Sequence, residues 1–291
     1  MTDTNKKIFY YIMILAMAGW GGSWVNAKVL TTYINEYELI FFRNIFTIIT
    51  LGPILWFSKK YFYINKQSFL LALFASIVMI GYMKFFFLGT KFGTASLGGS
   101  LVTTLIPINT FLLMAIFFGR RILKKDIFAL LLGAIGVMTM LNVWSFSYEE
   151  VFSIQNIYFL IASLLWPILT IISSKTTKTS PMVFTFYLYV ITTIMVSFGF
   201  VDFTSIDYAS YDSIFWLNIL SYAVISTTFA TTVYFVGVEK LGANEVSSFV
   251  FLVPFFAIVF SMIFLDEEIS ISIIVGTILT VLAVKILNST K

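Results

Sequence analysis

The chain has 291 residues, of which 59% are hydrophobic and only 11% are charged, and its formal net charge is +4. A typical soluble domain is about 25% charged, so this chain has too little polar surface to coat a soluble particle. The composition therefore predicts an integral membrane protein. The absence of cysteine and histidine excludes disulfides, thiolate chemistry and imidazole ligands or bases, and a charge of +4 is too small to indicate nucleic acid as a partner.

Ten stretches are long and apolar enough to cross a bilayer as α-helices, which takes about 20 residues each. They cover residues 8–28, 37–57, 67–89, 94–119, 127–145, 152–173, 181–200, 213–236, 243–265 and 270–288. The first stretch contains Ala16-Met17-Ala18, which resembles the cleavage site of a secretory signal. Because the apolar run continues to Val29, we interpret it as an uncleaved first helix. The expected fold class is all-α with ten transmembrane helices.

Basic and acidic residues alternate between the connections of these helices. With both termini inside, the external connections contain only Lys28 and Lys91 as basic residues and are rich in acids. The inner segments contain Lys6, Lys7, Lys59, Lys60, Lys66, Arg120, Arg121, Lys124, Lys125, Lys175, Lys178, Lys240, Lys285 and Lys291. Because cytoplasmic connections are enriched in lysine and arginine, this pattern predicts that both termini are cytoplasmic.

One stretch of sequence occurs twice. Each copy opens with glycine and small residues, passes one proline in an apolar helix, and reaches a charged cluster thirteen residues after that proline. The copies run from Gly93 through Pro107 to Arg120 and from Gly242 through Pro254 to Glu267. A membrane bundle tolerates an interior proline, and we expect it to break both helices at mid-membrane. Five helices in each half predict two inverted repeats, at residues 1–147 and 148–291.

Short motifs follow one another in a characteristic order. They are Gly19-Trp20-Gly21-Gly22-Ser23 with Lys28, Glu38-Leu39-Ile40-Phe41-Phe42-Arg43, Gly89 to Ser96 followed by Pro107, and Pro254 followed by Leu265-Asp266-Glu267 and Gly276. In this order the chain resembles the ten-helix EamA-type branch of the drug/metabolite transporter superfamily over essentially its whole length. The resemblance implies carrier-mediated movement of a small metabolite by alternating access, often as export across the bacterial cytoplasmic (inner) membrane.

The chain also departs from this family in two places. The family commonly has a glycine-glutamate pair after the proline helix in both halves, whereas the first copy here has Gly119-Arg120. The small four-helix multidrug members carry a glutamate in the first span as a proton carrier, and that span holds no acid here. Proton coupling of that kind is therefore not supported.

Small and hydroxyl residues form a stripe on each proline helix. Ser96, Ser100, Thr103, Pro107 and Thr110 recur at steps of four and three, which places them on one helical face, and Ser247, Pro254 and Ser261 form the corresponding stripe. Such residues also allow close helix packing, which is the alternative interpretation. As a set beside a proline, they indicate a cavity wall. The substrate-binding candidates from these stripes are Ser100, Thr103, Pro107, Ser247 and Pro254.

Two tryptophans occupy corresponding positions of the first and sixth spans. Trp20 and Trp166 lie near mid-span, whereas tryptophan usually favours the membrane interface. They are candidates for the wall of a substrate site, with packing in the core as the alternative. Ser23 and Asn26 complete the candidate set on the first span.

Arg43 and Lys84 are the charges that lie well inside the predicted spans. An ion inside the membrane is costly, which favours a functional role, although long basic side chains can also extend to the headgroups. Glu36 is in line with Arg43 on the second span and could pair with it. We expect Arg43 and Lys84 to hold the anionic end of a substrate.

These features favour a secondary transporter, and specifically an exporter of an amino acid or another organic anion. The alternatives are an intramembrane enzyme and a non-transporting membrane scaffold. An enzyme would need a metal site, an activated nucleophile or paired carboxylates, and no span holds the residues for one. We expect no cofactor and no metal, a small-molecule substrate and the lipid bilayer as partners, and a monomeric protein.

Overall fold

The computed structural model describes residues 3–58, 62–119, 121–145, 147–176, 179–241, 249–250 and 252–288, and this part of the chain contains helices and no strand. The α-helices are α1 (Asp3–Leu30), α2 (Glu36–Phe57), α3 (Lys66–Phe92), α4 (Ala95–Phe118), α5 (Lys124–Met140), α6 (Tyr148–Val151), α7 (Ile154–Ser174), α8 (Pro181–Gly199), α9 (Ser213–Ser221), α10 (Ala230–Leu241), α12 (Leu252–Leu265) and α13 (Ile271–Asn288). Val143–Ser145 (η1) and Tyr208–Ser210 (η2) form 3-10 turns, and Tyr222–Phe229 (η3) is a π-helix.

Seven helical stretches of the described chain are long and apolar enough to cross a membrane. They cover Ile8–Leu30, Glu36–Phe57, Lys66–Phe92, Ala95–Phe118, Ile154–Ser173, Pro181–Gly199 and Ser213–Tyr234, which confirms seven of the predicted spans. The predicted fifth span was too long at its end. Helix α5 stops at Met140 because Asn142 has a left-handed backbone, with φ of 54°, and the η1 turn follows. Helices α12 and α13 are apolar but shorter.

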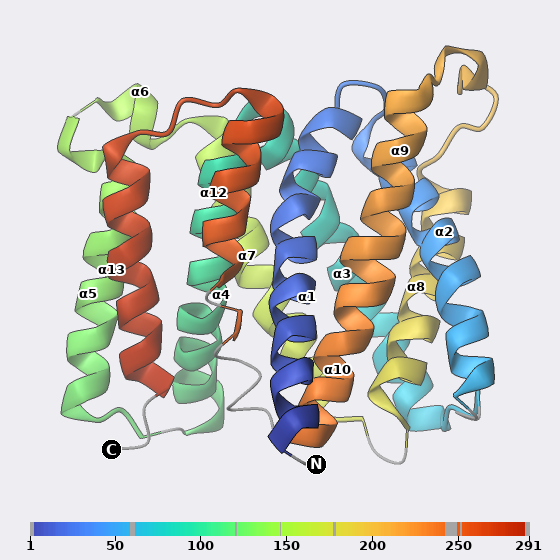
Figure 1. The fold of residues 1–291 in the computed structure, drawn as a ribbon, viewed down its shortest axis with the longest axis horizontal. Helices are drawn as coiled ribbons and strands as arrows, with labels where there is room; N and C mark the ends of the chain where they lie inside the picture. The colour runs from blue at the N-terminus through green and yellow to red at the C-terminus, as the bar shows by residue number, and fades with distance from the viewer. Residues whose placement is uncertain are drawn as a thin grey trace.

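The acidic and basic connections lie at opposite ends of the bundle (Figure 1). Helix α1 begins and helix α13 finishes at the same end, where α2 and α4 also finish. We call this the basic end because its connections carry Lys66, Arg121, Lys124, Lys125 and Lys175. We call the other end the acidic end because it carries Glu36, Asp202, Asp212 and Glu267.

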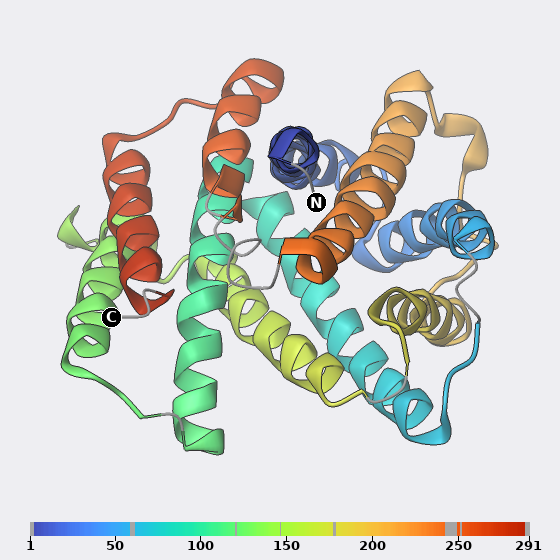
Figure 2. The same ribbon diagram turned by 60° about the horizontal axis from the view of Figure 1, so that its bottom comes forward.

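The helices form two groups with a diagonal pair between them (Figure 2). Helices α4, α5, α12 and α13 lie on one side, and α2, α8 and the α9–η3–α10 rod lie on the other. Helices α3 and α7 pack along each other and connect the two groups, while α1 contacts both α12 and α10. Helix α1, from the first half of the sequence, therefore packs against two helices of the second half.

Pro107 does not interrupt its helix as predicted, whereas the predicted ninth span has a turn at Val250, shortly before α12 begins. Helix α4 continues across Pro107, held between α7 and α12, so the predicted break there is wrong. Pro254 is the third residue of α12, in the first turn, where the missing N–H of proline costs little. The stretch 242–248, which includes the candidate Ser247, lies outside the described residues.

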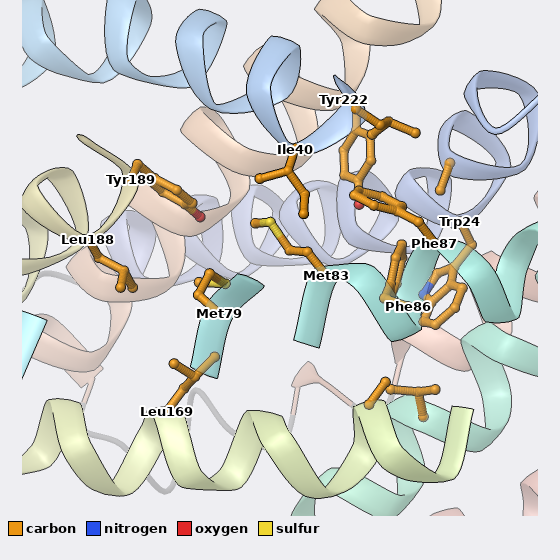
Figure 3. Packing of buried hydrophobic residues seen from close by; sticks show 14 of the residues in the cluster. Trp24, Ile40, Met79, Met83, Phe86, Phe87, Leu169, Leu188, Tyr189 and Tyr222 are labelled. Atoms are coloured by element: carbon orange, nitrogen blue, oxygen red, sulfur yellow. The ribbon is translucent and has the colours of Figure 1, made fainter. Parts of the chain in front are cut away.

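The core of the bundle is aromatic and is centred on α3. The ring of Trp24 lies 4.2 Å from that of Phe86 and 6.0 Å from that of Phe159, measured between centroids. Figure 3 shows Phe86 and Phe87 of α3 beside Trp24. Where α1 crosses α12, only a glycine fits, because a Cβ built on Gly21 would lie 2.4 Å from the Cβ of Phe256.

Candidate functional site

Arg43 lies at the centre of the candidate site, among side chains from three other helical segments. Its Nε donates a hydrogen bond to the hydroxyl of Thr227 (3.2 Å), and its Nη1 lies 3.3 Å from the sulfur of Met83. Its guanidinium carbon lies 4.8 Å from the ring centroid of Tyr222 and 5.8 Å from that of Tyr189. Helix α2 thus inserts a cation between α3, α8 and η3. Met83 lies between Tyr189 and Tyr222 in Figure 3.

The contacts that the described residues make with Arg43 are aromatic, hydroxyl and thioether groups, and none of them is a carboxylate. Glu36, the acid that the sequence suggested as a partner, lies two helical turns away and interacts with Lys84 instead. Aromatic faces and a hydroxyl stabilise a cation but do not neutralise it. The arrangement is therefore suited to receive an anion.

The π-helix η3 provides two of these contacts. The hydroxyl of Thr227 donates to the carbonyl of Tyr222, five residues back (3.0 Å), while its oxygen accepts from Arg43. The neighbouring hydroxyls tie η3 to the first half of the chain: Ser226 donates to the carbonyl of Gly19 (2.6 Å), and the hydroxyls of Thr228 and Thr50 lie 2.6 Å apart. π-helical turns within α-helices are frequent at functional sites.

Sequence reasoning missed this segment, because residues 213–236 read as one uninterrupted apolar span. The signal that could have identified it is a cluster of hydroxyl residues at 226–228 and 231–232 in the middle of that span. Several of them line a small cavity next to Arg43, between α2, α8 and α10. Its walls are Leu51, Met182, Thr185, Tyr189, Thr227, Thr231 and Thr232.

Lys84 lies apart from this cluster. Its ammonium is 5.5 Å from the ring centroid of Tyr37, forms a hydrogen bond with that side chain, and interacts with Glu36. Tyr37 and Glu36 belong to the first turn of α2, at the acidic end. The contacts of Lys84 thus match the alternative interpretation, in which the side chain extends toward the membrane surface, and they share no residue with those of Arg43.

The two candidate tryptophans pack against tyrosines in different places. The ring of Trp166 lies 4.8 Å from that of Tyr82 on α3, and Tyr82 interacts with Arg43, so Trp166 borders the surroundings of Arg43. The ring of Trp20 lies 5.1 Å from that of Tyr234 on α10, in a second cluster of the core. The structure therefore does not bring the two tryptophans into one wall.

The polar candidates of α1 bond within the bundle. The hydroxyl of Ser23 donates to the carbonyl of Trp20 in its own helix (2.6 Å). The amide of Asn26 donates to the hydroxyl of Ser221, the last residue before η3 (3.3 Å). Asn26 thus connects α1 to the rod that carries Tyr222 and Thr227.

The candidates on α4 form a separate group. Thr103 donates to the carbonyl of Gly99 (2.5 Å), and Pro107 lies one turn further along. Ser100 has no exposed surface, and its hydroxyl has no partner among the described residues. Sequence reasoning missed Asn109, whose amide donates to the carbonyl and the hydroxyl of Ser163 (both 3.0 Å) and joins α4 to α7.

Comparisons with known proteins agree with this architecture. The chain is 23% identical over 266 residues to the uncharacterized transporter YoaV of Bacillus subtilis (strain 168), covering 89% of each protein. A crystal structure of another protein superimposes with a TM-score of 0.63 at 15% identity, over 97% of this chain and 96% of that one, and shows the same fold. The sequence model of the EamA-like transporter family matches residues 7–142 and again residues 153–289. The chain therefore belongs to the EamA-like transporter family, as a multi-pass membrane transporter.

Proposed function

We propose that this chain is a secondary transporter that exports a small organic anion, such as an amino acid, across the bacterial cytoplasmic membrane. The observation that carries the substrate class is Arg43, a cation inside the bundle whose described contacts include no carboxylate. A guanidinium in such a place is stabilised when an anion pairs with it. A substrate carboxylate can accept two parallel hydrogen bonds from the guanidinium.

The surroundings of Arg43 suggest how the rest of such a substrate is recognised. Thr227 lies beside the guanidinium, and Thr185, Thr231 and Thr232 line the adjacent cavity, so hydroxyl-bearing residues lie near the place proposed for the carboxylate. Tyr189 and Tyr222 supply flat apolar walls on either side. A compact substrate with one carboxylate and a short apolar or polar body fits this chemistry best.

We infer that transport proceeds by alternating access between two inverted five-helix halves, 1–147 and 148–291, with both termini in the cytoplasm. Two matches of the family model, one in each half, support this division. The lysines and arginines at the basic end support a cytoplasmic position for that end. Export is the direction that the family resemblance favours, and no intramembrane carboxylate suggests a coupling ion, so facilitated export or exchange is the simplest mode.

A thermal-shift screen of the purified protein against a metabolite panel identifies the substrate, because a ligand that binds only the folded state raises its apparent stability. Transport of the identified acid and of its neutral ester is then compared in Arg43→Gln. Loss of a charged hydrogen-bonded pair, at about 1.5–3 kcal/mol, should weaken transport of the acid about 10- to 100-fold and leave the ester nearly unchanged.

Arg43→Lys and Lys84→Gln serve as controls. Arg43→Lys keeps the charge but loses the paired geometry, so it should recover part of the activity toward the acid. Lys84→Gln should affect acid and ester equally, because Lys84 contacts Tyr37 and not the Arg43 cluster. Equal losses for acid and ester in Arg43→Gln would show that Arg43 is structural and would refute the anion site.

A further inference from the structure

At the acidic end, Glu267 from the second half of the chain contacts the start of α4 in the first half. This residue follows α12, and its carboxylate accepts three hydrogen bonds from the start of α4. The donors are the backbone N–H of Ala95 (2.7 Å), the backbone N–H of Ser96 (3.0 Å) and the hydroxyl of Ser96 (2.7 Å). The carboxylate therefore neutralises the positive end of the α4 helix dipole with both of its oxygens.

The backbone next to Glu267 aims its side chain back at α4. Asp266 adopts a left-handed conformation with φ of 50°, which ends α12 and reverses the chain direction. The N–H of Glu267 then donates to the carbonyl of Ser261 (3.3 Å). Aspartate is one of the few non-glycine residues that adopt this conformation readily, so Asp266 suits the turn.

Lys28 adds a third helix to the same contact. Its ammonium donates to the carbonyl oxygens of Gly93 (2.6 Å) and Lys91 (3.1 Å), at the junction of α3 and α4, and it interacts with Glu267. The outer ends of α1, α4 and α12 are thus held together by one cation and one anion. At this contact and one turn below it, Ser96 and Ser100 have no exposed surface, so this part of α4 is covered in the structure.

The two copies of the repeated sequence differ at the position of Glu267. In the first copy, the position that corresponds to Glu267 in the sequence is occupied by Arg120, which lies outside the described residues. A guanidinium cannot accept hydrogen bonds from a helix N-terminus, and the positive end of the helix dipole repels it. The sequence of the first copy therefore does not supply the acid that this contact uses.

We propose that Glu267, together with Lys28, is a latch that holds the acidic end of the transporter closed at rest. Outward opening then requires the start of α4 to separate from Glu267, and the resting protein favours access from the basic end. This inference rests on the alternating access proposed above. Its test uses no substrate, so a failure of the latch and a failure of the substrate assignment are distinguishable.

The test measures how fast one buried position becomes accessible. Wild-type protein contains no cysteine, so Ser100→Cys provides a single reporter one turn below Ser96. Intact cells are treated with a small, membrane-impermeant thiol reagent, and the labelling rate is compared with and without Glu267→Gln. Removing the charge from three hydrogen bonds should raise the labelling rate of the reporter by about 10- to 100-fold.

Glu268→Gln is the matched control, because Glu268 is the next residue and is exposed; its labelling rate should equal that of the unmodified reporter. Ser96→Ala removes only one of the three donors and should raise the rate about fivefold, which keeps the test possible if Glu267→Gln fails to fold. Unchanged labelling in folded Glu267→Gln, or in Ser96→Ala, would show that the contact is only a static helix cap and would overturn the latch.

Discussion

Two adjacent glycines of α1 allow the packing of this bundle to be tested with the same substitution at neighbouring positions. A Cβ on Gly21 would lie 2.4 Å from the Cβ of Phe256 and 2.9 Å from the backbone nitrogen of Ala257. A Cβ on Gly22 would meet only the ring of Phe260, at 3.6 and 3.7 Å. Carbon atoms in contact normally lie about 3.5–4.0 Å apart, so Gly21→Ala forces α1 and α12 apart by roughly 1 Å, whereas Gly22→Ala fits.

The expected energies follow from these distances. Overpacking against backbone atoms costs about 1–3 kcal/mol, and replacing glycine by alanine inside a helix returns up to about 1 kcal/mol. Gly21→Ala should therefore be destabilised, Gly22→Ala should be neutral or slightly stabilised, and the two should differ by about 2 kcal/mol. That difference corresponds to roughly a thirtyfold change in the unfolding equilibrium constant.

Reversible unfolding of the purified protein in mixed micelles of a mild detergent and sodium dodecyl sulfate measures this difference. Tryptophan fluorescence provides the signal, since Trp24 is buried in the core on the same helix. Equal shifts of the unfolding midpoint in both variants, or a more stable Gly21→Ala, would contradict the close crossing of α1 and α12.

Three further predictions concern other parts of the molecule. Ser205→Cys should react with an impermeant thiol reagent on intact cells, because the acidic end is expected to face outward, and labelling only after lysis would reverse this orientation. Pro107→Ala restores an N–H that can bond the Thr103 carbonyl, so it should raise the unfolding free energy by roughly 1–3 kcal/mol, and an unchanged midpoint in the same unfolding assay would contradict this. A hydrogen bond from the N–H of Phe215 lowers the pKa of Asp212 at the start of α9, so this stabilisation is present above the ordinary value of 3.8 and is lost as pH falls through the lowered pKa. Asp212→Asn should therefore lose less thermal stability than the wild type between about pH 5 and pH 2, and equal losses would contradict the assignment.

The hydrophobic spans could be predicted from sequence because their length and composition reflect the thickness of the membrane. The exceptions depend on local backbone geometry that hydropathy does not measure. Asn142 ends α5 early through a left-handed conformation, and Pro107 remains inside a continuous helix because α7 and α12 hold α4 from both sides. The same proline in an unsupported helix would have produced the predicted break.

The candidate site could be predicted only in part. Arg43 stood out because a cation inside a span is costly, but apart from Met83 its partners come from α8 and η3, more than 140 residues later in the chain. Lys84 is also a cation inside a predicted span, but its position in the sequence does not indicate that it packs against Tyr37 of α2. Glu267 was one of several acids after the second proline helix, and nothing in its sequence neighbourhood indicated that it caps α4.

The π-helix decides which side chains face Arg43. An α-helix has 3.6 residues per turn, so Tyr222 and Thr227, five residues apart, would point in clearly different directions around it. In η3 the Thr227 hydroxyl lies 3.0 Å from the Tyr222 carbonyl, and both side chains contact the guanidinium. A return of this segment to an α-helix would turn one of the two away from Arg43. Because Ser226 and Thr228 tie the same segment to α1 and α2, movement of those helices would be transmitted directly to the surroundings of the cation.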